Sequence, residues 1–313
     1  MRGVLRAAKR MRAVPVGWAR FGPLSRFIAR RIPSLRPPLL LLAFPRSGSS
    51  WVGEILGSAE DALYLREPFS QGLNVRNGRK GTVTLQVDAA YGRDVERAFL
   101  GLPAFPERVV LFPQQWGLRG RSAARVVIKE VNPLAAEWLI TAYRPRVILL
   151  IRHPAAIALS YRRLGWGWDR LDLARFGPYL DTILRPWRTL LERAQGFWEW
   201  HGVLQGAALR VAKEALDAWQ DHRVVRYEDL CEAPLPLFRD LYAFGGLSWS
   251  GRIEAVVEGK SSGGDRDDPY QTTRPSREMA FRWRGHVGQA DLEHLRAAYT
   301  AFNLPWYTTS NDW

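Results

Sequence analysis

The sequence predicts an α/β protein in which a parallel sheet carries helices on both faces. Its strongest signals are two runs of consecutive apolar residues, Leu39–Ala43 and Val147–Ile151, which suit strands buried on both sides. Each run is followed by a short turn and then by a helical pattern. Strands that alternate with helices are typical of parallel sheets, whose ligands bind at the carboxyl ends of the strands.

The first strand leads into a loop of small residues. Residues 44–51 read Phe-Pro-Arg-Ser-Gly-Ser-Ser-Trp, and a helix is expected from this loop to about Ser58. Gly48 allows the backbone to turn tightly, and the loop serines supply hydroxyl donors. Backbone N–H groups at the start of a helix attract anions. The loop therefore predicts a binding site for a phosphate-like group.

The spacing of this loop differs from two common nucleotide motifs. It lacks the Gly-x-x-x-x-Gly-Lys-Ser/Thr pattern of nucleoside triphosphatases and the Gly-x-Gly-x-x-Gly pattern of dinucleotide enzymes. A P-loop nucleotide-dependent kinase-like enzyme stays open as an alternative, although no obvious metal-binding carboxylate follows a strand. A second alternative is a non-catalytic basic protein that binds membranes or nucleic acid, which explains the net charge of +14 but not the loop.

A second motif follows the strand at Val147–Ile151. Arg152 leaves the carboxyl end of that strand, and Pro154 suits the first turn of a helix. Ser160 lies about two helical turns after the strand. Arg152 and Ser160 can therefore face the same crevice at the end of the sheet.

Together the two motifs resemble those of the sulfotransferases that use 3′-phosphoadenosine 5′-phosphosulfate. This resemblance spans residues 39–306 and implies a single P-loop-like domain, residues 37–313, preceded by a basic N-terminal extension, residues 1–36. It implies that the first loop holds the 5′-phosphosulfate, that the second motif holds the 3′-phosphate, and that a Tyr-Glu-Asp segment places a tyrosine near the adenine. A looser match at 282–285 would close over the 3′-phosphate. The donor-binding residues implied in this way are Arg46, Ser47, Gly48, Ser49, Ser50, Trp51, Arg152, Ser160, Tyr227, Arg284 and Gly285.

The resemblance also implies three catalytic residues, Glu67, Arg46 and Lys129. Glu67 lies in a Glu-Pro element like that of carbohydrate sulfotransferases, and tyrosylprotein sulfotransferases carry a catalytic glutamate in a comparable position. Glu67 is therefore expected to be the general base; the alternative is a loop glutamate paired with Arg66 or another guanidinium. Val131 stands where cytosolic sulfotransferases have their catalytic histidine, which favours Glu67. Arg46 and Lys129 are expected to offset charge on the departing phosphate.

The histidines and the single cysteine do not indicate a metal. No Cys/His cluster occurs in the sequence, and His153 is expected to have a structural role at the start of a helix. One cysteine, Cys231, allows no internal disulfide. The implied co-substrate is 3′-phosphoadenosine 5′-phosphosulfate, with no metal cofactor. The acceptor is expected to be a hydroxyl on a glycan or glycolipid, while a peptide tyrosine and a small metabolite stay open.

Further elements are predicted along the chain. A strand over 126–130 and another at 224–225 complete the sheet, with helices over 133–143, 204–219 and 291–302. Residues 70–120 are expected to form an insertion over the acceptor cleft, and residues 261–269 a mobile loop. Trp166 and Trp168 are candidates for the acceptor groove, whereas packing in a helical layer is the favoured interpretation of Trp198 and Trp200. An aromatic tail ending at Trp313 is expected to dock on the core.

Basic residues concentrate before Pro37, where no acidic residue occurs. Val4, Leu5, Ala8 and Met11 form an apolar stripe at helical spacing. Three interpretations stay open for this segment: a helix on an anionic membrane, a disordered basic arm, or a targeting signal. The sequence has no run of ~18 to 20 apolar residues and no apolar core of a secretory signal. The protein is expected to be cytoplasmic or membrane-peripheral, without specific nucleic-acid binding, and no pattern indicates an oligomeric state.

Overall fold

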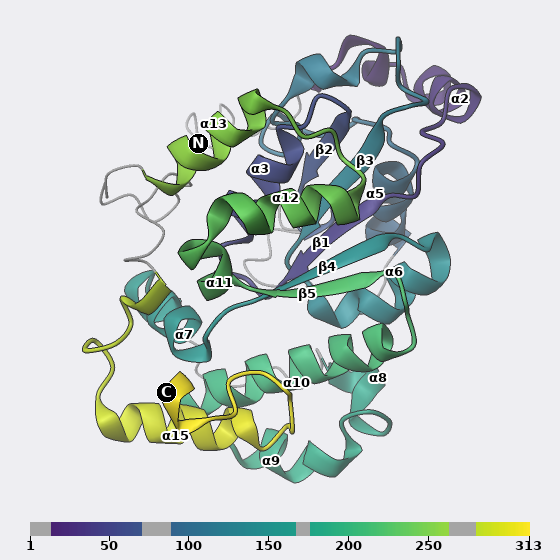
Figure 1. The fold of residues 1–313 in the computed structure, drawn as a ribbon. Coiled ribbons are helices and arrows are strands. Elements are labelled where there is room, and N and C mark those ends of the chain that lie inside the picture. The colour runs from purple at the N-terminus through teal and green to yellow at the C-terminus, as the bar shows by residue number, and fades with distance from the viewer. Residues whose placement is uncertain (1–13, 71–88, 167–175, 263–279) are drawn as a thin grey trace, which may run out of the picture.

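Five parallel strands form the sheet at the centre of the protein (Figure 1). The computed structural model describes residues 14–70, 89–166, 176–262 and 280–313. The strands stand in the order β2-β3-β1-β4-β5, and every neighbouring pair is parallel. The predicted fold class, a single P-loop-like α/β domain with a parallel sheet, is confirmed. The strand bounds are β1 Leu39–Ala43, β2 Ala62–Arg66, β3 Arg125–Glu130, β4 Arg146–Ile151 and β5 His222–Arg226.

Helices cover both faces of this sheet because alternate strand side chains point in opposite directions. In β1, Leu39, Leu41 and Ala43 pack on one face, and Leu40 and Leu42 pack on the other. Figure 1 shows α3, α12 and α13 on the opposite side of the sheet from α6 and α10. The first face carries α3 Ser49–Gly57, α11 Tyr227–Glu232, α12 Pro234–Gly245 and α13 Gly251–Ser261. The second carries α5 Ala89–Phe99, α6 Ala136–Tyr143, α7 Pro154–Arg163 and α10 Phe197–Asp217.

A further helix, α15 Gln289–Thr300, packs against α10 (Figure 1). Two glycines of α10 permit this close approach. A Cβ on Gly202 would lie 2.6 Å from the Cβ of Ala298, and one on Gly206 would overlap the Phe302 ring. None of the described helices is both long and apolar enough to cross a membrane. The remaining elements are α2 Gly22–Arg31, α8 Gly177–Leu180, α9 Arg188–Arg193 and the 3₁₀ turns η1 Gly17–Arg20, η2 Pro113–Trp116, η3 Pro133–Ala135, η5 Arg185–Trp187 and η6 Ser310–Asp312.

The described part of the N-terminal extension, residues 14–36, packs onto the core. Trp18 Nε1 donates a hydrogen bond to the Trp116 carbonyl at 2.8 Å. The side chains of Val16, Ala19 and Ala29 are buried in the main apolar cluster. A chain that starts at residue 14 would therefore keep the residues that make this packing, whereas a chain that starts near Ser34 would lack them. The apolar stripe between Val4 and Met11 lies outside the described residues.

Most of the predicted elements are confirmed. The predicted helix over 133–143 divides into η3 and α6, and α10 begins at Phe197 rather than near Leu204. The strand β2 was not predicted, because its five residues carry no strand signal beyond a short apolar stretch. Within the described residues 89–120, Val95, Phe105 and Val109 are buried in the core, so this segment packs on the sheet. Its expected place over an acceptor cleft stays a prediction.

Candidate active site

The loop after β1 turns sharply into α3 at Gly48. This residue has φ +86°, a left-handed conformation that favours glycine, and it caps the N-terminus of α3. A Cβ at this position would overlap the Tyr227 ring. Ser47 is fully buried, and its Oγ donates to the Phe44 carbonyl at 2.7 Å. The loop is thus fixed against Tyr227, and the first N–H groups of α3 have no partner within the helix.

The two motifs that the sequence assigns to phosphates meet in the structure. Arg46 Nε donates to Ser160 Oγ at 2.9 Å, and Arg152 Nη1 donates to the Arg46 carbonyl at 3.1 Å. The Arg152 guanidinium also lies over the Tyr227 ring, 4.3 Å from its centroid. These contacts follow from the sheet, because β1 and β4 are parallel neighbours whose carboxyl ends share one edge. The structure therefore gathers Arg46, Gly48, Arg152, Ser160 and Tyr227 in one place.

The residues that open α3 divide between the site and the core. Ser49 is buried and Ser50 is half-buried, and the first turn of α3 contains no acidic residue to repel an anion. Trp51 is buried, and its ring meets Tyr227 edge-on with 5.8 Å between the ring centroids. A second edge-on contact joins Trp51 to Phe238 at 5.2 Å. Trp51 therefore holds the Tyr227 ring in place by packing.

Glu67 and Lys129 form an ion pair at the same edge of the sheet. Glu67 directly follows β2, Lys129 lies near the end of β3, and the Lys129 ammonium donates to Glu67 Oε1. The Glu67 N–H also donates to the Lys129 carbonyl at 2.7 Å, and Glu67 has φ +51°. The Lys129 side chain is 1% exposed and that of Glu67 is 17% exposed. Solvent or a substrate can thus reach the carboxylate but not the ammonium from outside.

Glu130, at the end of β3, holds the segment that follows Glu67. Its carboxylate accepts hydrogen bonds from the Phe69 N–H at 2.7 Å, from the Ser70 N–H at 3.2 Å and from the Ser70 Oγ at 2.5 Å. Burial raises the pKa of Glu130 to about 7, although the hydrogen bonds from Ser70 and Phe69 act to lower it. Because Glu130 is fully buried, its role is to position the Glu67 turn rather than to touch a substrate. The signal in the sequence is a second carboxyl directly after the strand lysine.

The order of the strands arranges these groups along the edge. β3 lies between β2 and β1, and β4 lies on the other side of β1. The carboxylate–ammonium pair of Glu67 and Lys129 therefore stands on one side of the loop after β1, and Arg152 stands on the other. A carboxylate and several cations around the N-terminus of a helix would suit the transfer of a group from a phosphate-containing donor.

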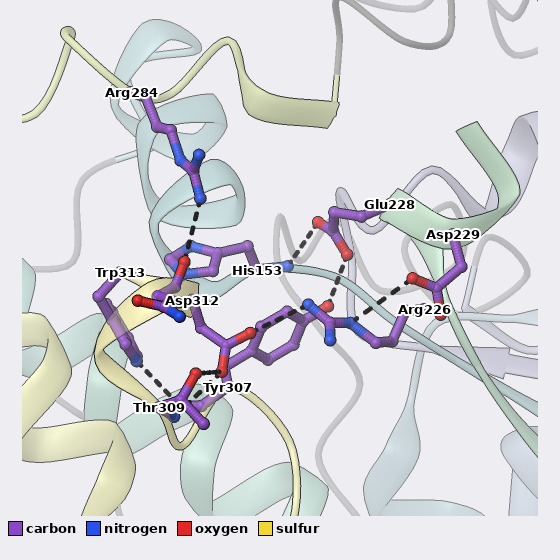
Figure 2. Close-up of polar contacts among 10 residues, drawn as sticks. His153, Arg226, Glu228, Asp229, Arg284, Tyr307, Thr309, Asp312 and Trp313 are labelled. Atoms are coloured by element: carbon purple, nitrogen blue, oxygen red, sulfur yellow. Dashed lines mark hydrogen bonds and ion pairs between the residues drawn. The ribbon is translucent and has the colours of Figure 1, made fainter. Parts of the chain in front are cut away.

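A buried network joins the start of α7 to the C-terminal tail (Figure 2). The His153 N–H donates to Glu228 Oε1 at 3.0 Å, and Tyr307 Oη donates to Glu228 Oε2 at 2.7 Å. Burial lowers the pKa of His153 to about 3, so the imidazole is neutral, and its Nδ1 accepts the Ala155 N–H at 3.2 Å. The imidazole therefore caps α7, which supports the expected structural role of His153.

The tail itself is locked by side chains that surround His153. Trp313 Nε1 donates to the Tyr307 carbonyl at 2.8 Å, and Arg226 Nη2 bonds Asp312 at 3.2 Å. The Trp313 ring packs against the His153 imidazole at 4.6 Å between centroids, which confirms that the aromatic tail docks on the core. Since His153 follows Arg152 directly, the tail supports the position of Arg152. The sequence does not predict these contacts of Glu228 and Tyr307, because Glu228 lies 75 residues from His153 and Tyr307 lies 79 residues from Glu228.

The segment with Arg284 and Gly285 lies against this tail. Trp283 stacks on His153 with 4.0 Å between ring centroids, which brings the segment close to Arg152. The Arg284 guanidinium donates to the Asn311 carbonyl at 3.3 Å and lies over the Trp283 ring at 5.6 Å. Gly285 has φ +77°, a turn that suits glycine. In this structure the Arg284 side chain therefore points to the C-terminal tail.

The tryptophans separate into packing residues and one site candidate. Trp198 and Trp200 are buried in α10, which matches the packing interpretation. Trp166 is 40% exposed, and the Arg46 guanidinium lies 5.9 Å from its ring centroid. Trp168 and the predicted loop from 263 onward lie outside the described residues. Trp166 is thus an exposed aromatic ring beside the loop that follows β1.

Among the described residues, no group of three or more His, Cys, Asp or Glu side chains is placed to hold a metal ion. His201 and Cys231 are both buried. Burial lowers the pKa of His201 to about 3 and raises the pKa of Cys231 to about 12. Neither side chain is placed or charged as a reactive group in this structure.

A parallel sheet whose carboxyl edge gathers a small-residue loop, arginines and a carboxylate–lysine pair is typical of enzymes that bind phosphate-containing ligands. The chain belongs to the sulfotransferase family. The model of this family, described as "Sulfotransferase family", matches residues 37–251. Mouse carbohydrate sulfotransferase 5 is 26% identical, over 88% of this chain and 83% of the relative. Human carbohydrate sulfotransferase 6 is 27% identical, over 83% and 78%. A solved structure of mouse sulfotransferase SULT7A1 complexed with PAP matches with a TM-score of 0.43 and 13% identity, over 85% of this chain and 84% of the other.

Proposed function

We propose that this protein transfers a sulfuryl group from 3′-phosphoadenosine 5′-phosphosulfate to an acceptor hydroxyl on a carbohydrate, either a glycan or a glycolipid. The observation that carries the proposal is the junction of the two phosphate motifs, in which Arg46 bonds Ser160 and Arg152 bonds the Arg46 carbonyl. A donor with anionic groups at both its 3′ and 5′ positions suits two linked anion sites. The curated relatives, which are carbohydrate sulfotransferases by name, support a carbohydrate acceptor.

Each donor-binding residue has a role in this proposal. Arg46, Ser47, Gly48, Ser49 and Ser50 surround the 5′-phosphosulfate with hydroxyl and backbone donors at the positive end of α3. Arg152 and Ser160 bind the 3′-phosphate, to which a guanidinium offers two donors at once. Tyr227 faces the adenine, and Trp51 supports its ring from the core. Arg284 and Gly285 close over the 3′-phosphate, which requires the Arg284 side chain to turn from Asn311 toward Arg152.

The chemistry follows from the ion pair of Glu67 and Lys129. The acceptor oxygen forms a bond to sulfur while the bond from sulfur to the bridging phosphate oxygen breaks, and Glu67 takes the proton of the acceptor hydroxyl. Negative charge then grows on the bridging oxygen, where Lys129 and Arg46 offset it. As Glu67 becomes neutral, the charge of the buried Lys129 ammonium is no longer balanced, and its field acts on the departing phosphate from within the protein. No step in this sequence needs a metal ion.

The exposed Trp166 ring supports a carbohydrate as the acceptor. Sugar rings present apolar faces that stack on tryptophan, and aromatic rings commonly line ligand sites. Trp166 lies beside Arg46, on the same side of the sheet edge as Ser160. A sugar stacked there would hold a hydroxyl near the anion-binding loop.

Calorimetric titration tests the proposal and separates it from the alternatives. The full chain is titrated with 3′-phosphoadenosine 5′-phosphate, the desulfated product, and separately with ATP and Mg²⁺. We expect the product nucleotide to bind without added metal and more tightly than ATP. Preference for ATP with Mg²⁺ would indicate the kinase-like alternative, and binding of neither would indicate a non-catalytic basic protein. Sulfuryl transfer to an oligosaccharide but not to a tyrosine peptide would then support the carbohydrate acceptor.

We also propose that the protein is cytoplasmic and that its basic N-terminal region, residues 1–36, contacts anionic membranes. The support is the charge of this region, which contains basic residues and no acidic ones.

A further inference from the structure

The outward face of α2 combines exposed apolar side chains with arginines. α2 packs on the core through Ser25 and Ala29, which are 1% and 0% exposed. Leu24, Phe27 and Arg31 follow an i, i+3, i+7 spacing, so they share the face that points away from Ser25 and Ala29. Leu24 is 54% exposed and Phe27 is 65% exposed. The helix therefore presents one buried stripe and one apolar stripe on the surface.

Phe21, which directly precedes α2, adds a third apolar side chain and is 63% exposed. Seven large apolar side chains are exposed in the described part of the chain, and these three lie within seven residues. Single exposed apolar residues are common on soluble proteins, but a cluster costs free energy unless a partner covers it. The α2 face is thus an interaction surface.

The charges around this face select its partner. Arg20, Arg30 and Arg31 are exposed beside the apolar stripe, and the region before Pro37 contains no acidic residue. Glu96 lies near, 3.5 Å from Arg30 and 3.9 Å from Arg26, and it neutralises part of this charge. Phenylalanine and leucine side chains flanked by arginines match the interface of an anionic bilayer, where acyl chains lie beneath a layer of negative headgroups.

We propose that the α2 face, defined by Phe21, Leu24, Phe27 and the flanking Arg20, Arg30 and Arg31, docks the protein on an anionic lipid membrane. This inference deepens the proposed membrane contact and moves it from the stripe at 4–11 to a folded helix. It does not depend on sulfuryl transfer.

The position of α2 fixes how a docked protein would stand. The chain leaves α2 and enters β1 from its amino end, where Arg36 Nη1 bonds Asp61, the residue before β2, at 2.7 Å. The residues proposed to bind the donor lie at the carboxyl ends of the strands. A five-residue strand places this end about 17 Å from its amino end. Figure 1 shows α2 and α7 at opposite ends of the sheet. A docked protein therefore keeps its active-site edge open to solvent.

Vesicle co-sedimentation at low salt tests the inference with the full chain. The vesicles contain phosphatidylcholine with phosphatidylglycerol, or phosphatidylcholine alone. We expect binding only to the anionic vesicles and release as the salt concentration rises. The double substitution Leu24→Ser with Phe27→Ser should weaken partitioning by roughly tenfold or more, because two apolar side chains no longer enter the bilayer. Arg31→Gln should weaken it roughly fivefold.

A matched control separates this face from general surface effects. Arg185→Gln removes an exposed arginine near α9 and should leave partitioning unchanged. Product-nucleotide affinity is measured for every variant and should stay at its starting value, which shows that each protein is folded. Nucleotide affinity and vesicle partitioning are measured separately. A protein that does not bind the proposed donor nucleotide can therefore still show docking, and the two results are distinguished.

Three outcomes would overturn the inference. One is equal partitioning of the starting protein and the Leu24→Ser, Phe27→Ser variant. Another is binding that disappears when residues 1–13 are removed but is insensitive to both α2 substitutions. The third is an unchanged vesicle affinity together with a change from dimer to monomer in sedimentation, which would assign the face to a second copy of the chain.

Discussion

The Glu67 carboxylate has two functions in the proposed reaction, as the partner of a buried lysine and as the acceptor of a proton. Glu67→Gln keeps the size and shape of the side chain but removes the base. Turnover should fall by at least ~100-fold, while product-nucleotide affinity stays within a few-fold. Steady-state transfer rates and calorimetric titration give the two values.

A matched control for this change is Asp61→Asn. Asp61 also pairs with a cation, Arg36, at 2.7 Å, and its side chain is 23% exposed, but it lies directly before β2, at the amino end of the strand that Glu67 follows. Its substitution should leave turnover near the starting value. If Glu67→Gln retained normal turnover, Glu67 would not be the base.

Glu130 couples the stability of the site to pH. Its pKa is about 7 in the folded protein, against an ordinary value of 4.5, so between these values the folded state binds more protons than the unfolded chain. The contribution of Glu130 to stability therefore falls by about 3 kcal/mol as pH rises from about 4.5 to about 7, and it is constant above that window. Glu130→Gln does not titrate, so it should remove this slope.

Urea unfolding at about pH 5 and about pH 8 measures the effect as a difference between the starting protein and Glu130→Gln. The free energy of unfolding of the starting protein minus that of Glu130→Gln should be smaller at about pH 8 than at about pH 5. Two parallel pH profiles would show that the carboxyl has the same pKa in both states.

At the scale of elements, α10 and α15 are held together by glycines that bring their backbones close. Gly202→Ala should destabilise the protein by about 1 to 3 kcal/mol, because the added Cβ would lie 2.6 Å from the Cβ of Ala298 and 2.6 Å from the Leu295 carbonyl oxygen, both in α15. Gly259→Ala in α13 has open space around it and should instead stabilise by about 0.5 to 1 kcal/mol, since alanine favours helix. Thermal unfolding compares the two directly. Equal effects of the two substitutions would contradict the close approach of α10 and α15.

The elements differ in how well the sequence predicts them. β1, β3 and β4 were predictable because they are buried on both faces and contain runs of consecutive apolar residues, at 39–43, 126–128 and 147–151. α5 was not, because the segment around it is rich in glycine and arginine, although Val95 and Phe99 are spaced one helical turn apart. Short edge elements draw their stability from tertiary contacts, which local sequence does not record.

The residues proposed to bind the donor show the same limit at the scale of the site. Arg46, Gly48, Arg152 and Ser160 were predictable because each lies in a short motif directly after an apolar strand. The network of Glu228, Tyr307 and Trp313 was not, because it joins segments that are far apart in the sequence. Its effect is nonetheless local, since it fixes His153, the residue that follows Arg152.

For the whole molecule, the two ends of the sheet have separate tasks. The carboxyl end gathers the ion pair of Glu67 and Lys129 and the loop proposed to bind the donor, and the amino end carries α2 with its apolar and basic face. A protein that docks through α2 directs its active site away from the bilayer. Under this arrangement a free glycan, or a glycan held well above the membrane, reaches the site more readily than a headgroup of the same leaflet.

The central claim is that the two phosphate motifs form one site for a nucleotide with a 3′-phosphate. Arg152→Ala tests it by titration with 3′-phosphoadenosine 5′-phosphate and with adenosine 5′-phosphate, which lacks that group. The variant should lose about 2 to 3 kcal/mol of affinity for the first nucleotide and little for the second, so that discrimination is largely erased. Arg162→Ala, an exposed arginine on the same helix as Ser160, should leave discrimination intact. Unchanged discrimination in Arg152→Ala would contradict the account.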